Sequence, residues 1–178
     1  MIDAGASSAR LAFDGQLAFA GSIEPLLPIA FRLAFAMLRD RDEAEDAVQE
    51  AAMKAWQKRR TFRPGAEPRP WFLAIVANEC RMARRRRRWS SIDQVRAKPD
   101  TRGDDPMATE EADQLRRALA RLAHADRLVL VLRFYLDFSN EEVARTLGIS
   151  AGAARVRVHR ALNRLRPEIR ALEVLLNG

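Results

Sequence analysis

Apolar residues recur at every third or fourth position over long stretches of the chain. This repeat matches the 3.6-residue turn of an α-helix that buries one face. Stretches in which apolar and polar residues alternate, as they do in half-buried strands, are scarce. Proline and glycine gather around 25–28, 64–70 and 99–106 and divide the helical pattern into blocks. The sequence therefore predicts an all-α protein.

The first block predicts a small helical domain over residues 17–90, preceded by an N-terminal extension, residues 1–16. Its helices are expected near 28–38, 42–59 and 71–87, each with an apolar stripe. A loop rich in proline and glycine separates the second helix from the third. The domain is thus predicted to be a bundle of three main helices.

The second block predicts another small helical domain, over residues 110–178. Leucines mark its first two helices, and two shorter helices are expected to follow. Between the blocks, residues 91–109 contain few apolar side chains, two prolines and several aspartates. Such a composition is typical of a flexible linker. We therefore expect two separate helical modules.

A helix-turn-helix is the strongest local prediction, over residues 139–166. Ser139 followed by Glu142 forms a capping box, which satisfies backbone amides at a helix start. Gly148 ends that helix because glycine adopts the left-handed turn conformation without strain. Ser150 is placed to cap the next helix.

The second helix of this motif and its continuation, residues 151–170, carry six arginines against a single acid, Glu168. One face presents Arg155, Val156, His159 and Arg160, and a helix of this kind can enter the major groove of DNA. The alternative is a surface helix with solvated arginines. We favour DNA binding because the cap, the glycine turn and the basic face occur together.

An acidic stretch, residues 42–50, holds five acids and no base in a basic protein. One interpretation is stabilisation of the helix start, where the macrodipole favours negative charge. The other is a surface that binds a basic protein partner. The residues alone do not favour either interpretation over the other.

An arginine run, residues 84–88, follows Arg81 near the end of the third helix. It suits contact with phosphates, although cations also stabilise a helix C-terminus. Trp71 and Asn78 add groups that can stack on or hydrogen-bond an exposed base, and Trp71 also fits the domain core.

Composition narrows the possible functions. The 178 residues carry a net charge of +7, with a pI near 10.8, which favours an anionic partner such as nucleic acid. Cys80 is the one cysteine, so no internal disulfide forms and the chain suits a reducing, cytoplasmic compartment. With two distant histidines and no nucleotide-binding glycine loop, we expect no catalytic residue, metal or cofactor.

Taken together, three stretches resemble the extracytoplasmic-function (ECF) sigma factors, group IV of the sigma-70 family. DEAEDAVQEAAMKAW, residues 42–56, resembles region 2.2. PWFLAIVANECRMARRRRR, residues 70–88, resembles regions 2.3 and 2.4. FSNEEVARTLGISAGAARVRVHRALNRLR, residues 138–166, resembles region 4.2. The resemblance covers about 17–176, nearly the whole chain, and implies sigma region 2 in the first domain and sigma region 4 in the second.

The resemblance implies roles for the matching residues. Partners would be core RNA polymerase (the clamp helices of its largest subunit and its flap), promoter DNA and, as is common in the family, an anti-sigma factor. No membrane or small-molecule substrate is implied. The implied polymerase-binding residues are Glu45, Asp46, Gln49 and Glu50. The implied minus-ten DNA residues, helped by the loop 61–69, are Trp71, Asn78, Arg81, Arg84 and Arg85. The implied minus-35 DNA residues are Arg155, Val156, Arg157, His159, Arg160 and Arg164.

The sequence departs from the family pattern at a few positions. Met82 stands where aspartate is frequent, Ala153 and Ala154 replace a usual Thr-Val pair, and Val156 replaces a frequent serine. Hydroxyls that touch phosphate or base are thereby lost, which bears on promoter preference rather than on docking.

The interpretation has rivals from other classes. A stand-alone helix-turn-helix regulator would bind operator DNA without polymerase, but it leaves the acidic stretch and the arginine run without a purpose. An all-helical enzyme would need a cluster of polar groups that the sequence does not show. A basic peripheral membrane protein would need a longer amphipathic basic helix.

Overall fold

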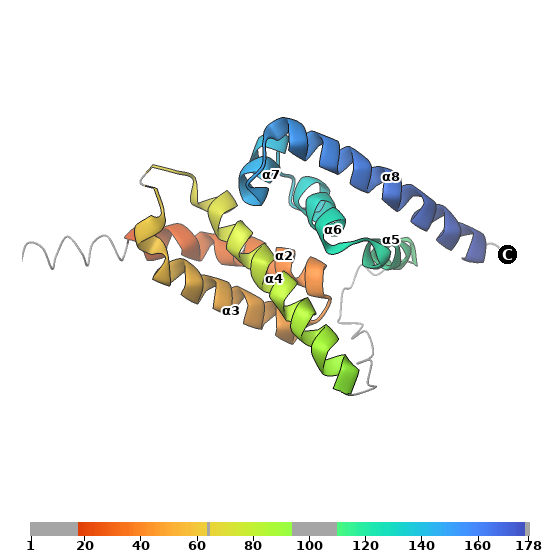
Figure 1. The fold of residues 1–178 in the computed structure, drawn as a ribbon, viewed down its shortest axis with the longest axis horizontal. Coiled ribbons are helices and arrows are strands. Elements are labelled where there is room, and N and C mark those ends of the chain that lie inside the picture. The colour runs from red at the N-terminus through yellow and green to blue at the C-terminus, as the bar shows by residue number, and fades with distance from the viewer. Residues whose placement is uncertain (1–17, 64, 94–109, 177–178) are drawn as a thin grey trace, which may run out of the picture.

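The computed structural model describes residues 18–63, 65–93 and 110–176, and the predicted all-α fold is confirmed over these ranges (Figure 1). A short helix over 18–23 and the 3-10 turn Glu24–Leu26 lead into α2, Leu27–Leu38. The helix α3, Arg41–Gln57, follows, and then α4, Pro68–Asp93. Within the described residues no strand occurs.

The first module is a bundle in which α2, α3 and α4 pack against one another. Leu33 and Met37 of α2 lie fully buried against Phe72 and Leu73 of α4 in a common core. The buried stripe of α3 consists mainly of small side chains, which lets its backbone approach its neighbours closely: Ala44, Ala47, Val48, Ala51 and Ala55. This bundle leaves the opposite faces of α3 and α4 open to solvent.

The segment Ala18–Leu38 has a mean hydropathy of 1.4 and is long and apolar enough to cross a membrane, judged by length and composition alone. In the structure, its second half is α2, whose Ala30, Leu33, Ala34 and Met37 face the core. A core helix passes the same test, so the apolar character of α2 is explained by its packing.

The helix α4 begins and ends outside its predicted bounds. Pro68 and Pro70 were expected in a loop, but proline is well tolerated in a first helical turn, whose amides have no intrahelical partner. At the other end the helix continues to Asp93, three residues into the predicted linker. The rest of that linker, 94–109, and the predicted extension, 1–16, lie outside the described residues.

The second module consists of α5, Glu110–Arg121, α6, His124–Leu130, a π-turn, Val131–Tyr135, α7, Asn140–Leu147, and α8, Ala151–Leu176. The core joins Leu132, Phe138 and Val143 to the inner face of α8. The prediction of two shorter final helices is wrong for α8, which continues through Pro167. Helices α5 and α6 pack along it, and Arg121 binds Glu168 at 3.2 Å.

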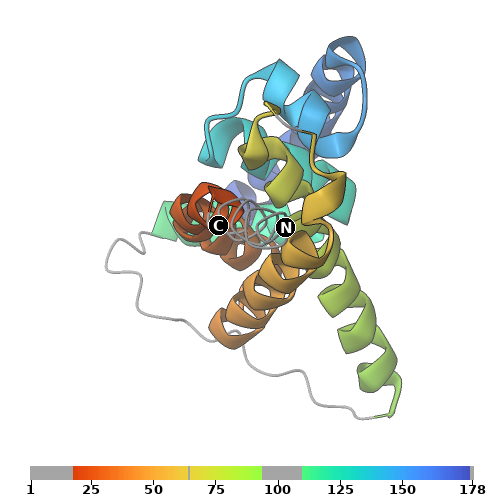
Figure 2. The same ribbon diagram turned by 90° about the vertical axis from the view of Figure 1, so that its left-hand side faces the viewer.

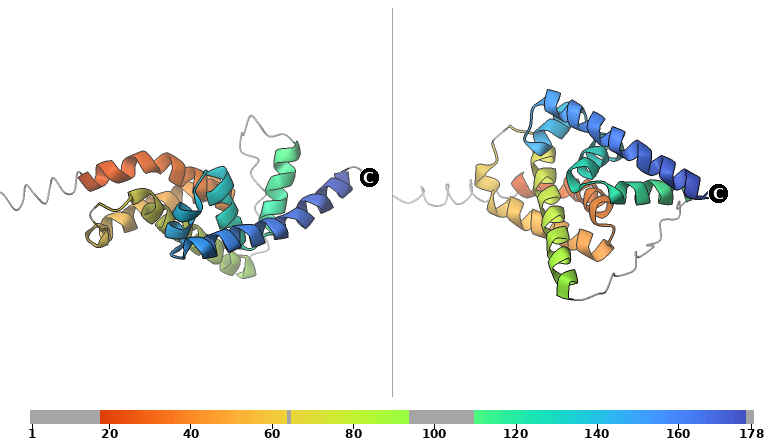
Figure 3. Two further views of the ribbon diagram at one scale, coloured as in Figure 1. Left: turned by 90° about the horizontal axis from the view of Figure 1, so that it is seen from above. Right: turned by 45° about the vertical axis from the view of Figure 1, so that its right-hand side comes forward.

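The two modules contact each other, with α7 lying beside the first turns of α4 (Figures 1 and 3). Arg69 of α4 donates to Glu142 at 3.3 Å and to the carbonyl of Leu136 at 3.2 Å, both in the second module. Its guanidinium also lies 4.1 Å from the centre of the buried Phe138 ring. A planar cation that stacks and donates together is a specific contact.

Further polar contacts join the modules. Arg145 of α7 binds Glu67 at 2.9 Å. The buried Arg127 of α6 donates to the carbonyl of Met37 at 3.2 Å, at the end of α2, and to the carbonyls of Leu119 and Ala120. Burial, with Arg84 and Arg39 nearby, lowers the pKa of Arg127 to about 10, so it remains charged at neutral pH. Figure 2 shows the far end of α4 projecting away from this junction.

Candidate nucleic-acid and protein interfaces

Acidic residues at the start of α3 cap the helix and bind α4. Asp40 is the N-cap, and its carboxylate accepts from the amide of Glu43 at 3.0 Å. Arg87 of α4 binds Glu43 at 2.7 Å and Asp40 at 3.5 Å. Asp40 was not predicted as a cap, although aspartate before an acidic first turn is a recognisable cap signal.

The remaining acids form an exposed face of α3. Glu45, Asp46 and Gln49 are exposed and Glu50 is half-buried. Helical spacing places them on the side opposite the alanine stripe. Met53, 55% exposed, and Trp56, 40% exposed, continue the same face toward the C-terminal end of α3. Glu45 pairs with Arg41 at 3.0 Å and Glu50 with Lys54 at 3.8 Å, both within the helix.

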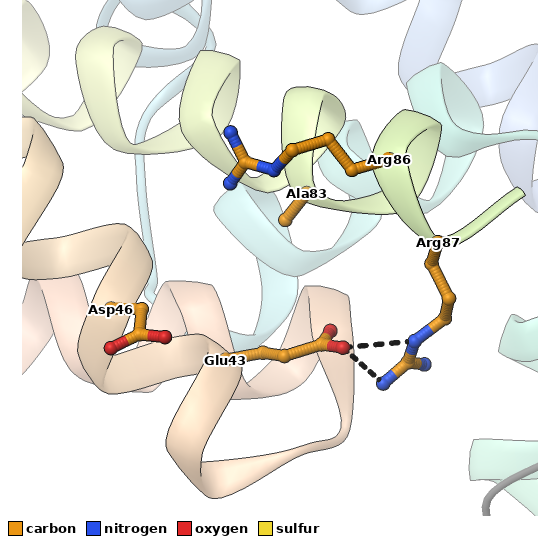
Figure 4. A pocket seen from close by; sticks show the side chains of 5 residues that line it. All are labelled: Glu43, Asp46, Ala83, Arg86 and Arg87. Atoms are coloured by element: carbon orange, nitrogen blue, oxygen red, sulfur yellow. Dashed lines mark hydrogen bonds and ion pairs between the residues drawn. The ribbon is translucent and has the colours of Figure 1, made fainter. Parts of the chain in front are cut away.

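A shallow hollow lies between α3 and α4 (Figure 4). Glu43 and Asp46 line it from α3, and Ala83, Arg86 and Arg87 line it from α4. Glu43 reaches Arg87, whereas the carboxylate of Asp46 lies away from that pair. Glu43 thus helps to hold α3 to α4, and Asp46 lies on the exposed acidic face.

Three of the five predicted minus-ten residues lie exposed on one side of α4. Asn78, Arg81 and Arg85 are exposed and share the face that points away from the core. Arg81 donates to the side-chain oxygen of Asn78 at 2.6 Å. The result is a polar surface with an amide and two guanidinium groups.

Trp71 lies two turns before Asn78 on the same face of α4, and it is partly buried. Its ring centre is 5.0 Å from that of Phe62, in the preceding loop, and 6.0 Å from that of Phe19. Trp71 therefore belongs to an aromatic cluster that fixes the loop against the helix.

Arg84 lies on a different side of α4. It is half-buried and near His124, the first residue of α6. Helical spacing separates it from the face of Asn78 and Arg85. The structure thus places Arg84 toward the junction of the modules rather than with the other predicted DNA residues.

His124 lies at that junction. Burial, followed by repulsion from Arg84, Arg127 and Arg81, lowers the pKa of His124 from 6.5 to about 4. The unfolded chain binds this proton more readily, so His124 contributes stability above pH 6.5 that is lost as the pH falls toward 4. From the sequence, His124 was expected in a short turn between helices, and no role was predicted for it.

His124→Gln is therefore expected to make stability less dependent on pH. Between pH 6.5 and 4.5, the free energy of unfolding should fall more steeply in the wild-type chain than in the variant. Urea unfolding at a series of pH values measures both slopes. Equal slopes would contradict the placement of a neutral His124 between the modules.

Cys80 lies in the core, fully buried on α4. Burial raises the pKa of its thiol to about 12, so the thiolate that nucleophilic or metal chemistry requires is not formed at neutral pH. Within the described ranges, no group of three or more metal-ligating side chains gathers.

The capping signals of the helix-turn-helix are confirmed. Ser139 accepts from the amide of Glu142 at 3.1 Å, and the Glu142 carboxylate accepts from the amide of Ser139 at 2.7 Å. Gly148 has φ of 64°, in the left-handed region, and Ser150 accepts from the amide of Ala153 at 3.2 Å. These contacts set the angle at which α8 leaves α7.

The first turns of α8 present the predicted basic face. Arg155, Val156, His159 and Arg160 are exposed and lie together, while Ala154 and Val158 on the other side are buried. His159 contacts Asn163 at 3.1 Å. This face holds donors around an exposed valine, which suits base edges and phosphates in a major groove.

The two other predicted residues of α8 lie at the edge of this face. Arg157 is exposed on its flank. Arg164 binds Asp126 of α6 at 2.5 Å and so connects α8 to its own module. The structure therefore gives Arg164 a structural partner that the sequence did not reveal.

Two family models match the chain: sigma-70 region 2 over residues 23–90, and sigma-70 region 4 over residues 112–165. The ECF RNA polymerase sigma factor SigL of Mycobacterium tuberculosis is 31% identical over 151 residues, covering 82% of this chain and 85% of that protein. The RNA polymerase sigma factor CarQ of Myxococcus xanthus is 34% identical over 143 residues, covering 78% and 81%.

Solved structures agree in fold. The sigma factor RpoE, in complex with the anti-sigma factor NepR from Bartonella quintana, matches with a TM-score of 0.65 and 28% identity, covering 86% of this chain and 97% of that one. CnrH, in complex with the cytosolic domain of CnrY, matches with a TM-score of 0.67 and 24% identity, covering 92% and 94%. The second likeness concerns the fold alone.

Proposed function

The chain belongs to the ECF sigma factors of the sigma-70 family, which bind core RNA polymerase and direct transcription initiation, and we propose that its two modules divide this work between three surfaces. The single observation that carries the assignment is the presence of both family regions in order, on a chain whose exposed faces differ in charge.

The exposed face of α3 docks on polymerase. Glu45, Asp46, Gln49 and Glu50 supply negative charge, and the neighbouring Met53 and Trp56 supply apolar area. Protein interfaces combine apolar anchors with a polar rim, as this face does. The matching basic surface is the pair of clamp helices on the largest polymerase subunit. The flap of polymerase would hold the second module.

The outer face of α4 holds the melted minus-ten strand. Asn78 presents an amide beside Arg81, and Arg85 follows one turn later. The preceding loop, fixed by Trp71 and Phe62, completes the surface. Exposed bases bind to surfaces that combine hydrogen-bonding groups with cations that neutralise phosphate.

The exposed face of α8 reads the minus-35 duplex. Arg155, His159 and Arg160 supply donors, and Val156 supplies an apolar contact for a thymine methyl group. Binding by both modules at once gives a gain in avidity.

Promoter binding requires the modules to part. The two promoter elements are separated by roughly 25 base steps, or ~85 Å at 3.4 Å per step. In the structure, Arg69 and Glu142, from the two modules, are 3.3 Å apart. One closed arrangement cannot serve both elements, so we propose that the junction opens when the chain binds polymerase and DNA.

Charge reversal at the junction is expected to favour the open form. Arg145→Glu places like charges at the contact with Glu67, and the double variant Glu67→Arg/Arg145→Glu restores opposite charges. An ion pair this exposed is worth about 1 kcal/mol or less, so the closed fraction should change severalfold. Energy transfer between dyes at Gln57→Cys and Asn163→Cys, both exposed sites, measures it. Equal transfer in all three chains would contradict the proposal.

We propose that the chain carries out no covalent chemistry, because nucleotide addition belongs to polymerase, and that it acts in the cytoplasm. The sigma factor RpoE of Bartonella quintana forms a complex with the anti-sigma factor NepR, and we propose a regulator of this kind here. Exposed aromatic side chains close to the junction, Phe35, Phe134 and Tyr135, would offer it apolar contacts.

A gel-shift experiment with and without core polymerase tests the proposed function. A sigma factor should shift a cognate promoter fragment specifically in the presence of core enzyme. A stand-alone regulator would produce the same specific shift by itself, and that result would overturn the proposal.

A further inference from the structure

Glu79 is a buried carboxylate on α4 that has no role in the surfaces described above. It is 1% exposed and lies among the apolar residues of the first module. A charge this deep costs several kcal/mol unless it is paired, and a well-packed apolar pair is often as stable as the ion pair it replaces. Stability alone therefore does not explain Glu79, and the groups that it binds indicate its role.

The first of these groups is Lys54 of α3. Its ammonium lies 2.6 Å from one Glu79 oxygen and 3.8 Å from the carboxylate of Glu50. The fully buried Ala51 and Ala55 let α3 lie close enough to α4 for this contact. The ion pair thus connects α3, the helix with the acidic face, to the buried side of α4.

The second group is Asn78, whose amide nitrogen donates to the other Glu79 oxygen at 3.4 Å. Its oxygen accepts from Arg81 at 2.6 Å. The carboxylate and the guanidinium together fix which way the amide faces. One N–H and one lone pair of Asn78 are left for another partner, and a base edge offers the complementary pair.

We propose that Glu79 is a positioning residue for promoter opening. Held by Lys54, it orients the Asn78 amide, and Arg81 beside it, toward an unstacked base of the minus-ten strand. Glu79 itself touches no DNA. The inference rests on the proposed function and deepens it, because it links the helix that meets polymerase to the face that meets DNA.

Glu79→Gln tests the proposal in the assembled holoenzyme. Glutamine keeps the shape but removes the charge that binds Lys54, and its own NH2 group competes with that of Asn78. The probe is a promoter mapped with the wild-type chain, with 2-aminopurine in the minus-ten non-template strand. We expect opening to slow by about tenfold or more, as for a lost hydrogen bond to a charged group. Affinity for core polymerase should stay within about twofold, because the exposed face of α3 is unchanged.

A second variant separates positioning from stability. Lys54→Met/Glu79→Leu replaces the pair by apolar side chains, which should keep or raise the unfolding temperature. Opening should nevertheless stay slow, because the carboxylate that holds the Asn78 amide nitrogen is gone and Arg81 alone contacts the amide. Opening at the wild-type rate in either variant would overturn the inference.

The matched control is Glu168→Gln, which removes a carboxylate from an ion pair near the surface of the other module and should leave opening unchanged. If the wild-type holoenzyme opens promoters and the Glu79→Gln holoenzyme opens them at the same rate, this inference is overturned but the proposed function stands. A wild-type chain that opens no promoter would overturn both.

Discussion

Replacing Asp46 and Gln49 together by alanine is expected to weaken binding to core RNA polymerase by about tenfold or more, ~1.4 kcal/mol. Both side chains are exposed in the middle of the acidic face of α3. They lie beyond the first turn of α3, and the helix macrodipole stabilises acids mainly within that first turn. Asp46 is therefore expected to contribute little to stability. The unfolding temperature should therefore stay close to that of the wild-type chain. Titration of a dye-labelled chain with core enzyme measures the affinity.

Glu24→Ala is the control, because Glu24 is an exposed acid outside α3. It should leave the affinity unchanged. If the double variant bound core enzyme as tightly as the wild-type chain, the acidic face would not be the docking surface. Asp46 and Gln49 would then be solvated surface residues.

Arg160→Ala is expected to cost about 1–3 kcal/mol in binding of the holoenzyme to a cognate promoter if the guanidinium contacts a base edge. Arg160 is exposed on α8 beside Val156 and His159. On a promoter with a scrambled minus-35 element, the same substitution should cost much less. Competition gel shifts with the two promoters measure the difference.

Arg170→Ala is the matched control, because Arg170 is exposed on the same helix beyond the helix-turn-helix. It removes the same charge without touching the recognition face. Equal losses on the cognate and scrambled promoters for Arg160→Ala would assign this arginine to phosphate contact. Specific reading of the minus-35 element would then depend on other residues.

The sequence predicted the helices and caps that depend on neighbouring residues. Ser139, Glu142 and Gly148 act within a few residues of one another, and their contacts were confirmed. The exposed side of α3 followed from helical spacing in the same way, because periodicity determines which side chains face the core. The early start of α4 was missed because Pro68 suits both a loop and a first helical turn.

Contacts between distant residues could not be predicted from these patterns. Lys54 and Glu79 are 25 positions apart, and Arg69 and Glu142 are 73 apart. Spacing shows that a face is buried but not which partner covers it, since that depends on how the helices pack. The structural roles of Arg84 and Arg164 were hidden for the same reason. The neighbours of both arginines lie on α6, which is distant in sequence from each of them.

The most direct measurement is in vitro transcription of genomic DNA by purified core polymerase, with and without this chain, followed by mapping of RNA 5′ ends. The account predicts discrete start sites that appear with the chain and share two sequence elements upstream at a fixed spacing. RNA ends that are the same with and without the chain would contradict it.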